Sequence, residues 1–301
     1  MLFDNLNLKR VVLENKLFTN KGISLSVLRL DQVHPVISGN KLFKLHYFLE
    51  DAIASSHKTV ITFGGAYSNH LSATAYACKI SGVKSIGIVR GEEAEKLSHT
   101  LLQCKADGML LRFVSREEYS KKDTKNFHDL LTKEFGEHIL IPEGGFHPMG
   151  AKGASLIMDH VPQDTTHICC GMGTATTSAG LMLKKKPSQY IIGISALKGI
   201  SDFEKNISTL TSNQADLSQL NIFHDYHFGG YAKRTPELIS FMNNLYEQYN
   251  LPIDFVYTGK MMYAVIDQIK KDYFPLGSKI LCIHTGGLQG NLSLPAGTLF
   301  F

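Results

Sequence analysis

The stretch TVITFGGAYSNH, residues 59–70, passes from an apolar run into two glycines and then into polar residues that suit the start of a helix. Ile61 and Phe63 favour a β-strand, and Leu71 and Ala75 begin a helical pattern after the turn. We expect further strands at residues 24–30, 84–89, 109–114, 139–141, 166–170, 190–194, 221–223 and 279–283, with helices between most of them. This alternation is typical of an α/β protein with largely parallel sheets.

The composition is that of an ordinary globular protein, with 44% hydrophobic and 19% charged residues. A chain of 301 residues is long enough for two domains, and a formal net charge of +4 is too small to predict a nucleic-acid partner. Five cysteines without C-x-x-C spacing indicate reduced core residues in a cytoplasmic protein, and no local signature supports a cysteine nucleophile. No apolar run is long enough to span a membrane.

The turn at residues 64–70, GGAYSNH, is the first candidate site. Its glycines let the backbone bend sharply, and the helix that follows offers free N–H groups to an anion such as a carboxylate. A plain strand-to-helix turn capped by Ser68 or Asn69 is the structural alternative.

A second turn at residues 171–180, GMGTATTSAG, is the strongest phosphate signal in the chain. Glycines and hydroxyls at a helix start supply N–H and O–H donors for a phosphate. The stretch is not a Walker loop, because no Gly-Lys-Ser/Thr follows. Nor does it fit G-x-G-x-x-G, because Thr176 occupies the third glycine position. The pattern points to a phosphorylated cofactor of another class.

Three more stretches place polar groups at turns. SGNKLFKL at residues 38–45 puts Lys41 at a loop-to-helix junction, YTGK at 257–260 follows a β-like run at 255–256, and HTGG at 284–287 follows an expected strand. One kind of site explains all these features. Its lysine forms a Schiff base with an aldehyde cofactor, and its glycine- and threonine-rich loop holds the phosphate of that cofactor. That combination describes pyridoxal 5'-phosphate and predicts no metal.

These motifs, in this order and spacing, resemble the D-cysteine desulfhydrase and 1-aminocyclopropane-1-carboxylate deaminase family of pyridoxal phosphate enzymes, from about residue 39 to residue 290. The resemblance implies the fold of fold-type-II enzymes, with two open, twisted, largely parallel sheets flanked by helices. It also implies a homodimer. We expect residues 46–155 to form a smaller, mobile domain, and residues 1–45 and 156–301 to form a larger one that holds the cofactor.

The resemblance also implies roles for individual residues. Lys41 would carry the cofactor and move the substrate's α-proton, and Ser68, Asn69 and His70 would receive the substrate carboxylate, with Ser68 a second acid/base candidate. Tyr257 would lie against the cofactor ring, and Tyr231 is similar to the family's second active-site tyrosine. The remaining cofactor contacts implied are Lys44, Asn69, Gly173, Thr174, Ala175, Thr176, Thr177, Thr258 and Thr285.

Position 258 helps to choose between the two activities. Family members that open the cyclopropane ring resemble one another in having glutamate there and glutamine at position 70, whereas this chain has Thr258 and His70. A neutral hydroxyl does not stabilise a pyridinium charge, so the cofactor ring would be a weaker electron sink, which suits β-elimination of a thiolate. We therefore expect D-cysteine desulfhydration to pyruvate, ammonia and sulfide.

Other features leave the substrate open. Phe43 stands where better-studied members have a basic residue, residues 91–99 do not match their longer loop, and the chain has no tryptophan. Deamination of 1-aminocyclopropane-1-carboxylate, or of another D- or β-substituted amino acid, is one alternative. A non-catalytic protein that binds pyridoxal phosphate or an amino acid is the other.

Overall fold

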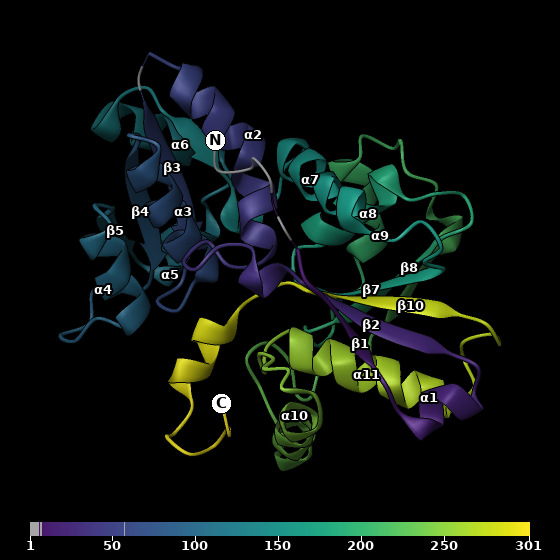
Figure 1. Ribbon diagram of the computed structural model, residues 1–301. Coiled ribbons are helices and arrows are strands. Elements are labelled where there is room, and N and C mark those ends of the chain that lie inside the picture. The colour runs from purple at the N-terminus through teal and green to yellow at the C-terminus, as the bar shows by residue number, and fades with distance from the viewer. Residues whose placement is uncertain (1–5, 7, 57) are drawn as a thin grey trace.

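The computed structural model describes residues 6, 8–56 and 58–301, and it contains two mostly parallel sheets (Figure 1). The strands are β1 Arg10–Leu13, β2 Ser24–Arg29, β3 Thr59–Gly64, β4 Lys84–Arg90, β5 Leu110–Val114, β6 Ile139–Ile141, β7 His167–Met172, β8 Tyr190–Ser195, β9 Leu220–Phe223 and β10 Lys279–His284. The six-stranded sheet has the order β1-β2-β10-β7-β8-β9, and the four-stranded sheet has the order β5-β4-β3-β6. Among these strands β1 alone pairs antiparallel, with β2. The predicted fold class is confirmed.

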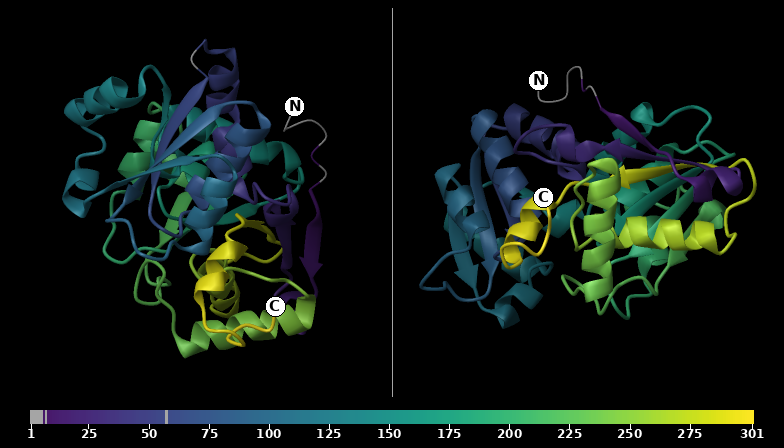
Figure 2. Two further views of the ribbon diagram at one scale, coloured as in Figure 1. Left: turned by 90° about the vertical axis from the view of Figure 1, so that its left-hand side faces the viewer. Right: turned by 60° about the horizontal axis from the view of Figure 1, so that its bottom comes forward.

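Helices flank both sheets. They are α1 Lys16–Asn20, α2 Asn40–Ala54, α3 Asn69–Ile80, α4 His99–Ala106, α5 Arg116–Ser120, α6 Lys125–Phe135, α7 Pro148–Ser155, α8 Thr176–Lys184, α9 Phe203–Leu210, α10 Pro236–Tyr249 and α11 Thr258–Lys270. Helices α7 to α9 cover one face of the six-stranded sheet, and α10 and α11 cover the other (Figures 1 and 2). Burial on both faces explains why the central strands are almost continuously apolar.

Helix α2 lies between the two sheets (Figure 1) and packs against α3 on one side and α7 on the other. Its apolar residues Phe48 and Leu49 belong to a buried cluster that extends from Val60 in β3 to Ile168 in β7. The boundary predicted at residue 46 therefore falls inside a helix that contributes to a shared core. The division into two domains stays a prediction.

The carboxyl ends of three parallel strands lead into the loops that the sequence singled out. Strand β3 ends before the turn to α3, β7 before the turn to α8, and β10 before the glycines at residues 286 and 287. In open parallel sheets this edge is where ligands bind. The fold thus brings the predicted motifs to the sides of the sheets where a site is expected.

Two details of the predicted secondary structure are wrong. Residues 255–256 form a turn rather than a β-like run, because the Val256 N–H donates to the Asp254 carboxylate and the Phe255 N–H donates to Asn291 Oδ1. The short edge strand β1 was not expected. All five cysteines lie in the described part of the chain, and each is buried and free, as predicted. No helix among the described residues is long and apolar enough to cross a membrane.

Candidate active site

Lys41 lies in the first turn of α2, where a tight approach between two loops sets its position. Gly39, the N-cap residue, has φ of 76°, and a Cβ atom added there would lie 1.9 Å from the carbonyl oxygen of Thr285. Only glycine tolerates both conditions. The Lys41 amine donates to Asn40 Oδ1 at 2.9 Å, and Asn40 Nδ2 donates to Thr177 Oγ1 at 2.7 Å. Asn40 therefore connects Lys41 to the start of α8.

A buried amine, that of Lys44, lies next to the half-buried Lys41. Lys44 is 4% exposed, and its amine donates to the carbonyl oxygen of Gly144 at 3.3 Å. Burial lowers the pKa of Lys41 to about 8, although the Asp254 carboxylate raises it in part. Burial and the charge of Lys41 lower the pKa of Lys44 well below its usual value. The pair favours a bound anion, and Lys41 provides an amine that is partly neutral, and so nucleophilic, near neutral pH.

The glycine- and threonine-rich loop presents free donors. Its N-cap residue Ala175 adopts φ of 61°, and no described side chain caps α8. The N–H groups of the first helical turn thus lack an intrahelical partner. Thr174 Oγ1 and Thr176 Oγ1 are 2.9 Å apart, and Gly173 precedes them. The loop has the geometry of an anion site at a helix N-terminus.

Tyr257 packs on this loop. A Cβ atom at Gly173 would lie 2.9 Å from the Tyr257 hydroxyl oxygen, so the absence of a side chain lets the phenol approach. Tyr231 lies next to it, with ring centroids 6.2 Å apart and planes at 63°. Tyr257 is half-buried, whereas Tyr231 is 55% exposed and so forms the outer member of the pair.

The turn before α3 is both a capped helix start and a place where N–H groups stay free for an anion. Ser68 is the N-cap, and its hydroxyl oxygen accepts from the backbone N–H of Leu71 at 3.2 Å. The cap leaves the N–H groups of Asn69 and His70 without an intrahelical partner. Asn69 Oδ1 is buried and has no hydrogen-bond partner among the described residues. A Cβ atom at Gly287 would lie 3.2 Å from Asn69 Nδ2, which places the loop after β10 against this turn.

His70 is buried and uncharged at neutral pH. Its Nε2 lies 2.9 Å from Thr62 Oγ1, which donates its own proton to the carbonyl oxygen of Ile141 at 2.8 Å. His70 Nε2–H is therefore the donor. Burial, followed by the charges of Lys41 and Lys44, lowers the pKa of His70 to about 3.

Replacing His70 by glutamine is expected to make the protein less sensitive to acid. The usual pKa of histidine is 6.5, so between pH 6.5 and about pH 3 His70 is protonated in the unfolded chain but not in the folded chain. Proton binding then favours the unfolded state, and the free energy of unfolding falls as the pH drops. At pH 4.5 this loss is about 2–3 kcal/mol. Urea unfolding at pH 7 and pH 4.5 should show that His70→Gln lacks this loss. His224→Gln, at an exposed histidine, is the control, and an equal acid loss in both variants would contradict the prediction.

Thr258 is completely buried and is bonded to Asp254. Its hydroxyl donates to Asp254 Oδ1 at 2.5 Å and accepts from the Asp254 backbone N–H at 2.7 Å. Its single proton is therefore already donated, so toward a further group the hydroxyl can only accept. Thr285, the other threonine expected near the ring of the cofactor, is 8% exposed.

Asp254 is a buried carboxylate beside Tyr257 and Thr258 that the sequence did not single out. Its carboxylate is 1% exposed and accepts from the backbone N–H groups of Val256, Tyr257 and Thr258, each at 2.9 Å. An aspartate that bonds the N–H groups two to four residues ahead is a recognisable helix-start pattern, and residues 254–258 carried that signal.

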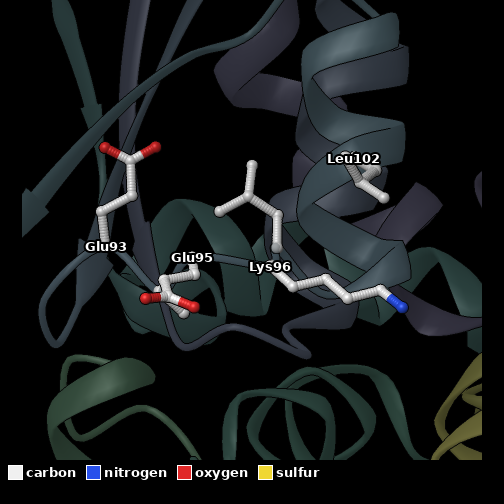
Figure 3. Close-up of a pocket in the computed structure, with 6 residues that line it drawn as sticks. Glu93, Glu95, Lys96 and Leu102 are labelled. Carbon is white, nitrogen blue, oxygen red and sulfur yellow. The ribbon is translucent and has the colours of Figure 1, made fainter.

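A surface hollow of about 650 Å³ lies elsewhere, on the segment between β4 and α4 (Figure 3). In Figure 3 the carboxylates of Glu93 and Glu95 and the amine of Lys96 point apart rather than toward a common centre. None of the predicted site residues lines it. It has the features of a solvated groove rather than of a binding site.

The grouped residues fit pyridoxal phosphate. When bound, this cofactor supplies an aldehyde that condenses with an amine and a ring that withdraws electrons from Cα. The chain offers the uncapped start of α8 to the phosphate, the Asn69 amide, whose Oδ1 has no partner among the described residues, to a polar ring substituent, and Lys41 to the aldehyde. The neighbouring amines of Lys41 and the buried Lys44 also suit a strongly anionic ligand.

Comparisons with known proteins agree with this chemistry. A family model described as pyridoxal-phosphate dependent enzyme matches residues 11–286. A putative 1-aminocyclopropane-1-carboxylate deaminase from Pyrococcus abyssi is 30% identical over 289 residues, which cover 89% of this chain and 86% of the relative. A bifunctional mitochondrial D-cysteine desulfhydrase/1-aminocyclopropane-1-carboxylate deaminase from Arabidopsis thaliana is also 30% identical, over 89% of this chain and 73% of the relative.

A solved structure leads to the same assignment. The crystal structure of a homologue of 1-aminocyclopropane-1-carboxylate deaminase has a TM-score of 0.79 and 28% identity, and the match covers 95% of this chain and 90% of that one. The family model spans most of the chain and includes every predicted site residue from Lys41 to Thr285. The chain therefore belongs to the family of pyridoxal-phosphate dependent enzymes, in the group of D-cysteine desulfhydrases and 1-aminocyclopropane-1-carboxylate deaminases.

Proposed function

We propose that this chain is a deaminating lyase that converts D-cysteine to pyruvate, ammonia and sulfide with pyridoxal phosphate. The observation that carries the choice of substrate is Thr258, whose neutral hydroxyl occupies the position where ring-opening relatives have glutamate. No carboxylate projects from that position, and the hydroxyl proton is donated to Asp254. Elimination of a good leaving group such as a thiolate needs less stabilisation of charge at Cα than opening of a carbon ring does.

The residues of the site would have separate roles in this reaction. The Lys41 amine, which is partly neutral because its pKa is about 8, would bind the cofactor and then take the proton from the substrate's Cα. The N–H groups at the start of α3, with Ser68 as N-cap, would hold the substrate carboxylate. His70 is uncharged and adds no positive charge to this carboxylate site. Tyr257 and Tyr231 would enclose the ring and the substrate side chain.

A substrate panel tests the proposal. Protein loaded with pyridoxal phosphate should release sulfide and keto acid from D-cysteine with kcat/KM at least about tenfold above that for L-cysteine or 1-aminocyclopropane-1-carboxylate, a difference of about 1.4 kcal/mol in transition-state stabilisation. Protein without cofactor is the control. Keto acid from the cyclopropane substrate at an equal or higher rate would overturn the substrate assignment.

The second candidate is deamination of 1-aminocyclopropane-1-carboxylate. It is favoured by the names of the Pyrococcus abyssi relative and of the solved structure, and the Arabidopsis relative carries both activities in its name. The buried Asp254 carboxylate behind Thr258 is the feature of this chain that would help it, because it places a negative charge one hydrogen bond from position 258. The same panel separates the two candidates. Cofactor binding without turnover of any panel substrate would instead favour a non-catalytic binding protein.

A further inference from the structure

Lys260 is a buried lysine to which the reaction described above assigns no part. It lies in the first turn of α11, three residues after Tyr257, and its side chain is 0% exposed. Its amine donates to the carbonyl oxygen of Gly230 at 2.8 Å and to that of Ala196 at 3.4 Å. Ala196 directly follows β8, whereas Gly230 lies in the loop between β9 and α10. One amine thus joins α11 to two loops at the carboxyl edge of the larger sheet.

The loop that Lys260 binds has an unusual backbone. Gly229 and Gly230 have φ of 95° and 117°, and the non-glycine residues Phe228 and Ala232 have φ of 49° and 52°. Consecutive residues in such conformations persist only where the surroundings fix them. Within the loop, the N–H of Gly230 donates to the carbonyl of His227 at 3.0 Å, and the N–H of Lys233 donates to that of Gly230 at 3.1 Å. These short turns fix the shape of the loop but not its place against the sheet.

Tyr231 depends on that placement. It directly follows Gly230, it is 55% exposed, and its ring centroid lies 6.2 Å from that of Tyr257, with the two planes at 63°. Tyr257 is fixed separately, because its backbone N–H donates to Asp254 and its ring packs on the loop before α8. The backbone of Tyr231 therefore reaches its place beside Tyr257 through a loop that Lys260 bonds to α11.

We propose that Lys260 is a positioning residue, which holds Tyr231 beside Tyr257 by binding the carbonyl oxygen of Gly230. The part that Tyr231 and Tyr257 play in the reaction rests on the proposed function, but the tether does not. Burying a charged amine beside two carbonyls is unfavourable. Burial therefore lowers the pKa of Lys260 to about 8, and the nearby Asp254 carboxylate offsets part of this effect by raising the pKa. The Lys260 amine is buried and donates to two carbonyl oxygens, which is expected if its N–H donors are needed.

Hydrogen–deuterium exchange tests the tether without any assay of activity. In full-length protein carrying pyridoxal phosphate, Lys260→Met should speed exchange in peptides covering residues 226–234 by at least about fivefold, because local opening of the loop becomes easier. Exchange in the strands of both sheets should stay unchanged. Lys233→Met, which removes an exposed lysine from the same loop, should exchange like the wild type and is the matched control.

Kinetics then test whether Lys260 acts through Tyr231. With D-cysteine, Lys260→Met is expected to raise KM about tenfold, and in a Tyr231→Phe background the same change should add at most about twofold, because residues that act as a unit are not additive. Additive effects in the double variant would overturn the link to Tyr231.

Failure of the tether and failure of the proposed function would give different results. Unchanged exchange at residues 226–234 in Lys260→Met would overturn the tether, whatever the enzyme turns over. Absence of turnover by the wild type would overturn the proposed function and leave the exchange result as a test of the tether. If Lys260→Met does not fold, Lys260→Leu, which also lacks an N–H donor, should show the same local rise in exchange. No rise in that variant would also overturn the tether.

Discussion

Replacing Lys41 by alanine is expected to remove the visible absorbance of the cofactor-loaded protein and to lower kcat by at least about a thousandfold. The amine is needed twice, as the group that binds the aldehyde and as the group that moves the α-proton, and loss of proton transfer alone has an effect of about 10²–10⁴-fold. Absorbance spectra and sulfide release from D-cysteine measure the two losses. An alanine variant that keeps its absorbance would contradict the assignment of Lys41.

Lys44 provides the control, because it is a neighbouring buried amine in the same turn of α2. Its pKa is lowered well below the usual value, so its basicity alone would also suit an attack on an aldehyde. The geometry separates the two lysines, since Lys44 points to the carbonyl of Gly144 and Lys41 to Asn40 beside the start of α8. Borohydride reduction followed by peptide mass mapping should place the cofactor on Lys41. Lys44→Met should keep the absorbance but bind the cofactor more weakly.

The fold and the grouping of the motifs were predictable because they depend on local patterns. Apolar runs such as residues 279–283 have the length of buried strands, and glycines followed by hydroxyl residues mark the turns after β3 and β7. Each turn follows the carboxyl end of a parallel strand, the edge of its sheet where ligands bind, although β3 and β7 belong to different sheets. The order of the strands, and therefore which turn faces which, depends on long-range pairing and was not accessible from those patterns.

The buried charges escaped prediction for a physical reason. Asp254 and Lys260 are charged residues in an apolar context, which a sequence pattern assigns to the surface, and both are at most 1% exposed. Asp254 is buried because four local donors satisfy it, and Lys260 because two distant carbonyls do. The donors to Asp254 follow it closely in the sequence, so their spacing is visible there. The carbonyls bonded by Lys260 come together only when α11 packs against the end of β8 and against the loop that precedes α10.

Asp254→Asn is expected to have the second large effect, and on two separate quantities. The amide has one acceptor oxygen where the carboxylate has two, and its NH₂ group would face backbone N–H groups that need an acceptor. We expect the free energy of unfolding to fall by about 3–5 kcal/mol, which is typical when one partner of a buried charge network is removed. Urea unfolding of the cofactor-free protein measures this loss. Asp164→Asn, at a surface carboxylate paired with Lys279, is the control and should change little.

The second quantity is the pKa of Lys41. Asp254 raises it, so removing the carboxylate should move it from about 8 to a lower value. Only the neutral amine attacks an aldehyde, so the rate at which cofactor-free protein takes up pyridoxal phosphate should rise with pH through that pKa. In Asp254→Asn the rise should occur at lower pH than in the wild type, measured on protein that is still folded. Thr258→Val, which alters the same turn but keeps the carboxylate, should leave the midpoint near that of the wild type. A midpoint that moves to higher pH in Asp254→Asn, or that moves equally in both variants, would mean that Asp254 acts on Lys41 through the shape of the turn and not through its charge.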